Sequence, residues 1–340
     1  MNTRHRDDER GETSPLAERL RRRVGREGTI SFRDWMRAAL YDEREGYYCR
    51  PGLARWGRVG DYRTSAERTP LFAATFARYF AALYEELGAP RGWSIVEAGA
   101  GAGHFAHVVL ETLERDHPRV FSATNYVIDE ASPDARARAA ELLVPYADRV
   151  EFRRLDDFAA PIEAGIIFSN ELLDALPVHR VTTRDGALRE LCVGLGEAGA
   201  FVWTEREPTT PDLARHFETA GVTLAEGQIA EVNLDAGRWV ARAAGLLRGG
   251  YLITVDYGAE ASDLYGAAHR RAGTLRAFKD HAPADDVLAR PGEQDLTTTI
   301  DWTQIKRAGE CAGLLTVLFE RLDEFLLKAG LLEQLERMTE

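Results

Sequence analysis

The sequence is poor in lysine, in cysteine and in long apolar runs, and each shortage excludes a class of protein. Only three of its 43 basic residues are lysines, which disfavours an enzyme that forms a Schiff base on lysine. The cysteines, Cys49, Cys192 and Cys311, are too far apart for a zinc motif and are typical of free thiols in a reducing cytosol. The longest apolar stretches are about six residues, against the roughly 20 of a membrane-spanning helix, so we expect no membrane segment.

Basic residues are also fewer than acidic ones. The 43 Lys and Arg residues against 55 Asp and Glu residues give a net charge of −12. Because a negative surface repels phosphate backbones, we expect no nucleic-acid partner and a mild preference for a cationic one. Residues 1–13 contain arginines but also several acids, and they have no apolar signal core. We therefore expect residues 1–13 to form a disordered tail of a cytoplasmic protein.

Helical signals dominate the first 90 residues. Caps, prolines and the spacing of apolar residues predict helices over 15–26, from Ser31 and from Pro70. Residues 46–69 are glycine-rich and aromatic without periodicity, which is typical of a long loop that is either functional or disordered. We interpret residues 14–90 as a helical N-terminal cover that carries an active-site loop.

The pattern changes at Trp93 to strands that alternate with helices. The predicted strands are 93–98, 123–129, 150–154, 164–169 and 250–256, and the main helices are 103–115, 133–146 and 235–248. This alternation predicts an α/β core over 91–340, a Rossmann-like, doubly wound parallel sheet with helices on both faces. Residues 178–205 instead alternate as short strands broken at Asp185-Gly186, which predicts an antiparallel hairpin or meander within an insertion at about 178–232.

The first core strand ends in a glycine-rich turn. Glu97 closes the strand, and Gly99, Gly101 and Gly103 follow at alternate positions before a helix. Glycines let a backbone approach a nucleotide closely, and a helix N-terminus offers unpaired N–H groups. A dinucleotide fingerprint needs glycine where this chain has His104, so the pattern looks instead like the S-adenosylmethionine site of class I methyltransferases. The alternative is a purely structural turn.

The next two strands also end in acids. Asp129 and Glu130 close the second strand, where an acid accepts hydrogen bonds from ribose hydroxyls, and either residue can serve. Asp156 and Asp157 follow the third strand, where an acid meets an adenine amine and Phe158 can stack on the ring. Acids in a surface loop are the alternative interpretation of this segment.

The fourth strand leads into Asn170, Glu171 and Asp174, which we expect at the mouth of the cofactor site. Asp174 lies three residues after Glu171, so we expect both carboxylates on one face of a helix. Such a pair can hold a guanidinium or an ammonium group, or take a proton from a nucleophile. The alternative is a helix N-terminus that carries acids because of the helix dipole.

Several motifs follow one another in a fixed order along the chain. They are Gly60-Asp61-Tyr62 with Thr64-Ser65 and Glu67, the glycine turn, Glu130 with Ser132-Pro133, the run Asn170–Val178, Asp256-Tyr257-Gly258, Gly273-Thr274-Leu275 with His281, and Asp295-Leu296-Thr297 with Asp301. This ordered series resembles the MidA family, the mitochondrial complex I assembly factor methyltransferases and their bacterial relatives. The resemblance implies a class I methyltransferase core with helical and β insertions, and S-adenosylmethionine as cofactor. In the mitochondrial members the acceptor is a protein arginine.

The strand-end positions and the resemblance together imply roles for individual residues. The expected cofactor-binding residues are Gly60, Asp61, Thr64, Ser65, Glu97, Gly99, Gly101, Gly103, Glu130, Asp156, Asp157, Phe158 and Asn170. The expected catalytic residues are Asn170, Glu171, Asp174 and His281. For His281, a histidine with a purely structural role is the alternative. We expect no metal site.

This chain departs from the family pattern at Leu172 and Leu173, where the family has aromatic residues. Their loss can widen the acceptor pocket, so O- or N-methylation of a small metabolite is an alternative to a protein acceptor. A cofactor-binding assembly protein without catalysis is a second alternative. Leucines at helical spacing over 322–338 are explained equally well by internal packing or by a homodimer seam.

Overall fold

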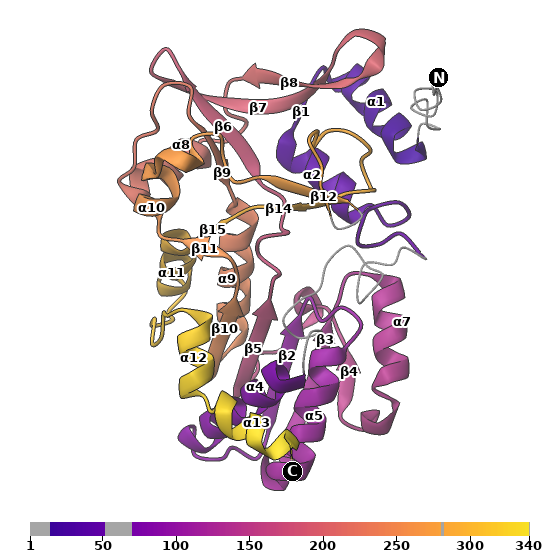
Figure 1. Cartoon of the computed structure of the whole chain (residues 1–340), viewed down its shortest axis with the longest axis vertical. Helices are drawn as coiled ribbons and strands as arrows, with labels where there is room; N and C mark the ends of the chain where they lie inside the picture. The colour runs from indigo at the N-terminus through magenta and orange to yellow at the C-terminus, as the bar shows by residue number, and fades with distance from the viewer. Residues whose placement is uncertain (1–13, 52–69, 280–281, 340) are drawn as a thin grey trace, which may run out of the picture.

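A five-stranded parallel sheet forms the lower part of the molecule in the computed structural model, which describes residues 14–51, 70–279 and 282–339 (Figure 1). The sheet has the order β10-β5-β2-β3-β4, and every neighbouring pair in it is parallel. Its strands are β2 (Trp93–Ala98), β3 (Thr124–Asp129), β4 (Val150–Phe152), β5 (Gly165–Asn170) and β10 (Gly250–Val255). The predicted parallel sheet is confirmed, with each strand within about two residues of its expected bounds.

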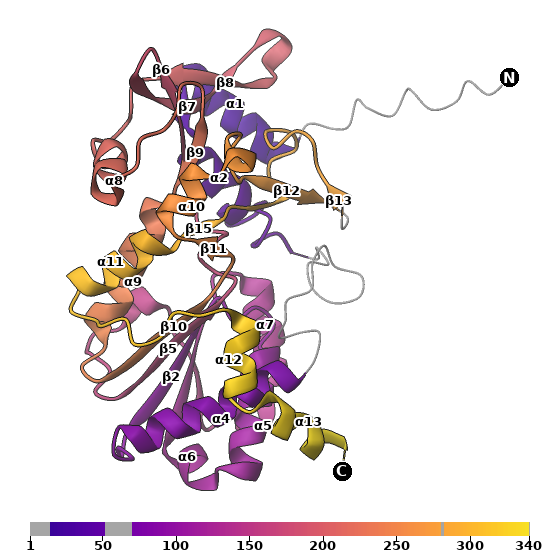
Figure 2. The ribbon, with the colours of Figure 1, turned by 60° about the vertical axis from the view of Figure 1, so that its left-hand side comes forward.

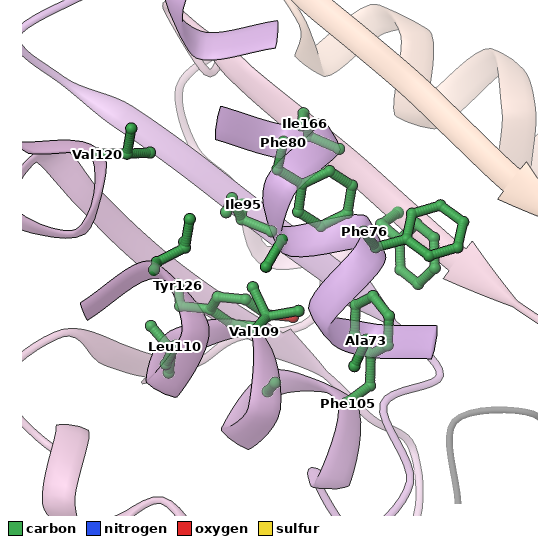
Figure 3. Close-up of a cluster of buried hydrophobic side chains, with 14 of the residues drawn as sticks. Ala73, Phe76, Phe80, Ile95, Phe105, Val109, Leu110, Val120, Tyr126 and Ile166 are labelled. Carbon is green, nitrogen blue, oxygen red and sulfur yellow. The ribbon is translucent and has the colours of Figure 1, made fainter. Parts of the chain in front are cut away.

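Helices cover both faces of this sheet, as predicted. Phe76 and Phe80 of one helix pack with Phe105 of the next against Phe168, and the rings of Phe105 and Phe168 are stacked with centroids 4.5 Å apart (Figure 3). Neighbouring strand residues point to the other face, where they contact α9. The helices are α4 (Pro70–Glu86), α5 (His104–Asp116), α6 (Pro118–Ala123), α7 (Pro133–Leu142), α9 (Leu234–Leu246), α11 (Trp302–Cys311), α12 (Leu322–Lys328) and α13 (Leu331–Thr339). We call this body the sheet lobe.

The upper part of Figure 1 is a second body, which we call the meander lobe and which combines residues 14–50, 178–232 and 258–301. Its antiparallel sheet has the order β1-β7-β6-β9, and β8 pairs with β7. Asp185 (φ +53°) and Gly186 (φ +73°) turn the chain between β6 and β7, at the predicted break. The strands are β1 (Ile30–Ser31), β6 (His179–Arg184), β7 (Ala187–Leu195), β8 (Phe201–Arg206) and β9 (Ile229–Val232). The antiparallel meander is therefore confirmed.

The three helices expected in the N-terminal cover lie in different lobes. In the meander lobe, α1 (Pro15–Glu27) and α2 (Phe32–Tyr41) bury Leu20 and Trp35 in one apolar core with Val193 and Leu296. By contrast, α4 packs on the parallel sheet (Figure 2). The periodicity of a helix shows which residues it buries, but not which sheet lies against that face.

The remainder of the meander lobe comes from late in the chain. It contains α8 (Asp212–Ala220), β11 (Gly258–Ala259), α10 (Ala261–Gly266), β12 (Arg276–Lys279), β13 (Ala282–Pro283), β14 (Asp295–Thr297) and β15 (Ile300–Asp301). Short 3₁₀ turns in the two lobes are η1 (Val144–Tyr146), η2 (Leu155–Asp157), η3 (Glu197–Gly199) and η4 (Ala268–Arg270). Because β14 and β15 return to α2 and to the end of β10, the two lobes meet above the carboxyl ends of the parallel strands (Figure 2).

The leucine-rich C-terminal segment forms two helices, which are separated at Gly330 (φ +98°). The ring of Phe325 in α12 lies 5.1 Å from that of Phe76, so internal packing explains the apolar face of α12. Nothing in the structure tests a homodimer seam. Within the described residues, no helix combines the length and the apolar character needed to cross a bilayer.

Candidate functional site

The glycine turn joins β2 to α5 at the carboxyl edge of the parallel sheet, where open α/β sheets bind their ligands. Gly99, Gly101 and Gly103 all have positive φ, at +73°, +55° and +80°. A Cβ on Gly103 would lie 2.9 Å from the Cβ of Ala139 in α7. Glycine is therefore required here both by the left-handed backbone and by the close approach of α7.

Glu130 holds this turn in place. The backbone N–H of Gly101 donates to Glu130 Oε2 at 2.8 Å, and that of Ser132 donates to Oε1 at 2.7 Å. Burial raises the pKa of Glu130, and the two backbone hydrogen bonds oppose that rise. Each carboxylate oxygen has a second lone pair, so Glu130 is able to accept a hydroxyl as well. Asp129, the other acid left open by the sequence, accepts a hydrogen bond from Arg154 Nε at 2.6 Å.

Glu97 lies beneath the turn with its side chain buried. The Tyr126 hydroxyl donates to Glu97 Oε2 at 2.6 Å. Burial raises the pKa of Glu97 to about 8, although the Tyr126 hydrogen bond favours its ionised form. The residue thus ties β2 to β3 directly below the glycines, and its contact with a cofactor stays a prediction.

Asp156, Asp157 and Phe158 lie at the same edge of the sheet, after β4. The Asp156 side chain is exposed and lies 3.5 Å from Arg242 Nε. The guanidinium of Arg153 lies 4.8 Å from the centroid of the Phe158 ring, which packs against the apolar core under α9. This position is compatible with the expected role beside an adenine, which no contact in the structure tests.

The segment after β5 differs from the prediction. Glu171 has a left-handed backbone (φ +51°), and residues 171–177 form turns rather than a helix. The backbone N–H groups of Leu173 and Asp174 donate to the carboxylate of Asp256, at 2.9 and 3.3 Å, instead of to helical carbonyls. The expectation of one shared helical face is therefore wrong, and so is its alternative of acids at a helix N-terminus.

The carboxylates nevertheless come together, because Asp256 ends β10 beside this turn. We call Glu171, Asp174, Asp256 and Asp295 the acidic mouth. Burial raises the pKa of Asp174 well above its usual value, and the neighbouring carboxylates raise it further, Asp256 most strongly. Burial also raises the pKa of Asp256 to about 7, although three backbone N–H groups bind its oxygens. Such a group of acids favours either protons or a bound cation.

Asn170, at the end of β5, adds an unsatisfied acceptor to this edge. Its Oδ1 is buried and has no hydrogen-bond partner in the described part of the chain. Buried polar atoms in proteins are nearly always paired, so an unpaired one at the end of a parallel strand indicates a position for a ligand donor. The amide therefore fits its expected place in the site.

Two tyrosines of the meander lobe complete the mouth, and the sequence reasoning did not identify them. The Tyr48 hydroxyl donates to Asp295 Oδ1 at 2.6 Å, and the Tyr41 hydroxyl donates to the carbonyl of Ala175 at 3.1 Å. Burial raises the pKa of Tyr41, and Asp295, Asp174 and Glu130 add to that rise. Asp256 and Asp295 were motif residues without an assigned role, whereas the only local signal for Tyr48 was its place in an aromatic loop.

The two leucines that replace the family's aromatic residues lie in different surroundings. Leu173 is fully buried in the core between α9 and α11. Leu172 packs on the glycine turn, where a Cβ on Gly99 would lie 3.0 Å from its Cδ1. Leu173 thus packs in the apolar core, and Leu172 packs on the cofactor turn.

Some expected residues have no described position. Gly60, Asp61, Thr64, Ser65 and His281 lie outside the described residues, so their roles stay predictions. Among the residues with described positions, no three His, Cys, Asp or Glu side chains are grouped to hold a metal ion. A cavity of about 250 Å³ lies elsewhere, between α8, α9 and α11, and none of the expected site residues lines it.

Comparison with known families agrees with this geometry. Residues 75–319 match the family described as "Putative S-adenosyl-L-methionine-dependent methyltransferase". The chain is 26% identical to "Protein arginine methyltransferase NDUFAF7 homolog, mitochondrial" of Drosophila melanogaster, over 88% of this chain and 70% of that protein. It is 24% identical to the Homo sapiens protein of the same kind, over 87% of this chain and 69% of that protein.

A solved structure is similar over almost the whole chain. It is a superfamily member from Burkholderia thailandensis, bound to S-adenosyl-homocysteine. The two proteins are 31% identical, and the match covers 95% of this chain and 82% of that one with a TM-score of 0.85. Both lobes, and not the parallel sheet alone, therefore have a counterpart in a protein that binds the demethylated cofactor.

Proposed function

The chain belongs to this family of S-adenosylmethionine-dependent methyltransferases, and we propose that its methyl acceptor is an arginine side chain of a protein. The acceptor proposal rests on one observation, the buried and half-buried carboxylates of the acidic mouth beside the glycine turn. A guanidinium is a planar cation with five N–H donors, and it pairs with carboxylates more specifically than an ammonium does. The names of the mitochondrial relatives support the same acceptor.

The residues of the sheet edge fit S-adenosylmethionine. When bound, this cofactor supplies a methyl group on a sulfonium, which is already a good leaving group. Gly99, Gly101 and Gly103 open the backbone for close approach, Glu130 offers its carboxylate to the ribose, and Asn170 Oδ1 offers an unpaired acceptor. The protein's own work is then to hold the acceptor in line, to exclude water and to manage the acceptor's proton.

We assign the orientation of the acceptor and the removal of its proton to Glu171 and Asp174. A carboxylate that contacts the guanidinium orients it and favours loss of its proton as the methyl group is transferred. The left-handed backbone of Glu171 is an uncommon conformation for a residue with a side chain, and such strain is concentrated at functional sites. Asn170 ends β5 directly before Glu171, whereas His281 lies outside the described residues, so its catalytic role stays a prediction.

The structure weakens the argument for a small-metabolite acceptor, which remains the alternative. Support for that acceptor rested on a pocket widened by Leu172 and Leu173, but Leu173 is buried in the core and Leu172 packs on the cofactor turn. The same buried acids argue against an assembly protein without catalysis, because burying carboxylates away from water is costly unless they are used.

A labelling experiment tests the acceptor. Cell extract is incubated with the protein and S-adenosylmethionine that is labelled in its methyl group, and the protein fraction is hydrolysed to amino acids. We expect label in methylated arginine, and label found only in small molecules would refute the proposal.

The role of Glu171 has its own test. Glu171→Gln removes the charge but keeps the size, so we expect turnover to fall by about 100-fold or more while S-adenosylmethionine binds within about twofold of normal. Isothermal titration measures the binding, and the exposed Glu141→Gln in α7 is the control. Undiminished turnover in Glu171→Gln would show that another group does this work.

We also propose a cytoplasmic location. None of the three cysteines forms a disulfide, which suits a reducing compartment, whereas the relatives cited above are named as mitochondrial. Fractionation of cells that carry a tagged protein tests this location.

A further inference from the structure

We propose that Asp295 binds the guanidinium of the acceptor opposite Asp174, and that Tyr48 positions Asp295 for this contact. Asp295 and Tyr48 come from the meander lobe, whereas Asp174 follows β5 of the sheet lobe. The inference rests on the proposed arginine acceptor and extends it, because it assigns selection of the acceptor to a different lobe from the one that binds the cofactor.

The meander lobe holds Asp295 rigidly. Asp295 begins β14, which pairs with β12, and its side chain is almost fully buried. The Tyr48 hydroxyl donates to Asp295 Oδ1 at 2.6 Å across 247 residues of sequence. A short hydrogen bond to a carboxylate fixes its orientation, so the hydroxyl of Tyr48 acts on a ligand through Asp295.

A direct backbone connection ties Asp295 to the sheet lobe. The N–H of Thr298, three residues after Asp295, donates to the carbonyl of Asp174 at 2.9 Å. This connection places the two carboxylates close enough for Asp295 to raise the pKa of Asp174. Two acids from different lobes therefore lie near one another at the carboxyl edge of the sheet.

Aromatic rings lie beside this pair, and an unpaired acceptor lies at the end of β5. The rings of Tyr41 and Tyr48 lie 5.4 Å apart, and the Tyr41 hydroxyl is fixed on Ala175, next to Asp174. Asn170 Oδ1 is buried without a partner in the described chain, which independently indicates a missing donor. Two carboxylates, an amide oxygen and aromatic faces match the several N–H donors and the flat face of a guanidinium better than they match an ammonium.

A metal ion is the competing occupant of a group of acids. Among the side chains that the structure describes, no three ligating groups are arranged for a metal, although the four acids of the mouth lie near one another. Arg276 is close enough to lower the pKa of Asp174, so the charge of a guanidinium in the protein already acts on this acid. The occupant assigned here is therefore an organic cation.

Titration calorimetry with a minimal ligand tests the inference. The probe is Nα-acetyl-arginine amide, the matched neutral probe is the citrulline amide, and S-adenosyl-homocysteine is present at saturation. We expect the arginine amide to bind and the citrulline amide to bind at least tenfold more weakly. Failure of the unmodified protein to prefer the arginine amide would overturn the inference.

Two variants separate positioning from folding. Tyr48→Phe removes one hydroxyl, so we expect the arginine amide to bind about three- to tenfold more weakly, with S-adenosyl-homocysteine binding unchanged. Asp295→Asn should abolish the preference over citrulline, and Asp295→Glu should restore part of it. The controls are Tyr84→Phe, on the sheet lobe, and the exposed Asp263→Asn in α10.

The outcomes distinguish this inference from the proposed function. Labelled methylarginine together with normal binding in Tyr48→Phe and Asp295→Asn would overturn the inference and leave the arginine acceptor standing. A raised KM with nearly unchanged kcat in Tyr48→Phe supports positioning, because a general loss of structure would lower cofactor binding too.

Discussion

Burial raises the pKa values of individual acids of the acidic mouth, because it makes their ionised forms less stable than those of an acid on the surface. Asp256 accepts three backbone hydrogen bonds, each of which favours the carboxylate, and burial still raises its pKa to about 7. Glu97 is similar, with a pKa of about 8 under a hydrogen bond from Tyr126. The sequence identifies such residues as acids at strand ends, but it does not show how much water reaches them.

The raised pKa of Asp256 predicts how methyl transfer depends on pH. The mouth holds a proton below about pH 7 and is more fully ionised above it, so binding of a cationic acceptor should strengthen as the pH rises through 7. We expect kcat/KM to increase with an apparent pKa near 7 that belongs to Asp256 and Asp174 together.

The measurement is a series of initial rates between pH 5.5 and 8.5 with saturating cofactor. Asp256→Asn should remove this step from the profile and lower the rate throughout, because the amide cannot carry the charge. If the profile of Asp256→Asn still rose near pH 7, the titrating group would be another residue.

Elements were predictable wherever the local pattern and the surrounding structure agree. The alternation of strands and helices predicted the parallel sheet, and Asp185-Gly186 predicted the turn between β6 and β7. The helix predicted after β5 does not form, because backbone N–H groups of this segment bind the Asp256 side chain, 82 and 83 residues further along the chain. Helix propensity depends on neighbouring residues, so it does not predict a hydrogen bond to a side chain so distant in sequence.

The glycine turn offers a prediction at the scale of elements, because it sets how closely α5 and α7 approach. Gly103→Ala adds a Cβ 2.9 Å from the buried Ala139 and also strains a left-handed backbone. We expect the free energy of unfolding to fall by about 2–4 kcal/mol, with weaker cofactor binding.

Gly88 after α4 provides the matched control. Its φ of +79° is nearly that of Gly103, but no atom lies within 4 Å of the position that a Cβ would occupy. Gly88→Ala should therefore cost only about 1 kcal/mol, with normal cofactor binding. Urea unfolding of both variants measures the difference, and equal losses would show that α7 does not restrict the turn.

At the scale of the whole molecule, the two lobes are interwoven rather than consecutive. The chain enters the meander lobe three times, and its apolar core draws on α1, α2, β7 and β14. The acceptor side of the site depends on this arrangement, since Tyr48 and Asp295 come from two of these passages. Anything that shifts one lobe on the other should change acceptor binding before it changes cofactor binding.

An ion pair between the lobes gives a prediction at this scale. Arg33 of α2 donates two hydrogen bonds to Asp235 of α9, at 3.0 and 3.1 Å, and both side chains are largely buried. Arg33→Met should lower the free energy of unfolding by about 1–2 kcal/mol and raise the KM for the acceptor.

Arg238 is the control, because it pairs with the same Asp235 from within α9 and is mostly exposed. Arg238→Met should cost less than about 0.5 kcal/mol. Thermal unfolding together with KM for the acceptor measures both variants, and equal effects would show that the pair does not hold the lobes together.

The sequence by itself determined the parallel sheet, the cofactor turn at Gly99–Gly103 and the acids at the strand ends, because each depends on local periodicity, on backbone freedom or on motif order. Only the tertiary structure decided which lobe each N-terminal helix joins, that residues 171–177 form no helix, and that Tyr48 and Asp295 stand at the mouth. These features depend on contacts between residues far apart in the chain. Burial and long-range hydrogen bonds arise when the two lobes close on one another, and no local pattern encodes them.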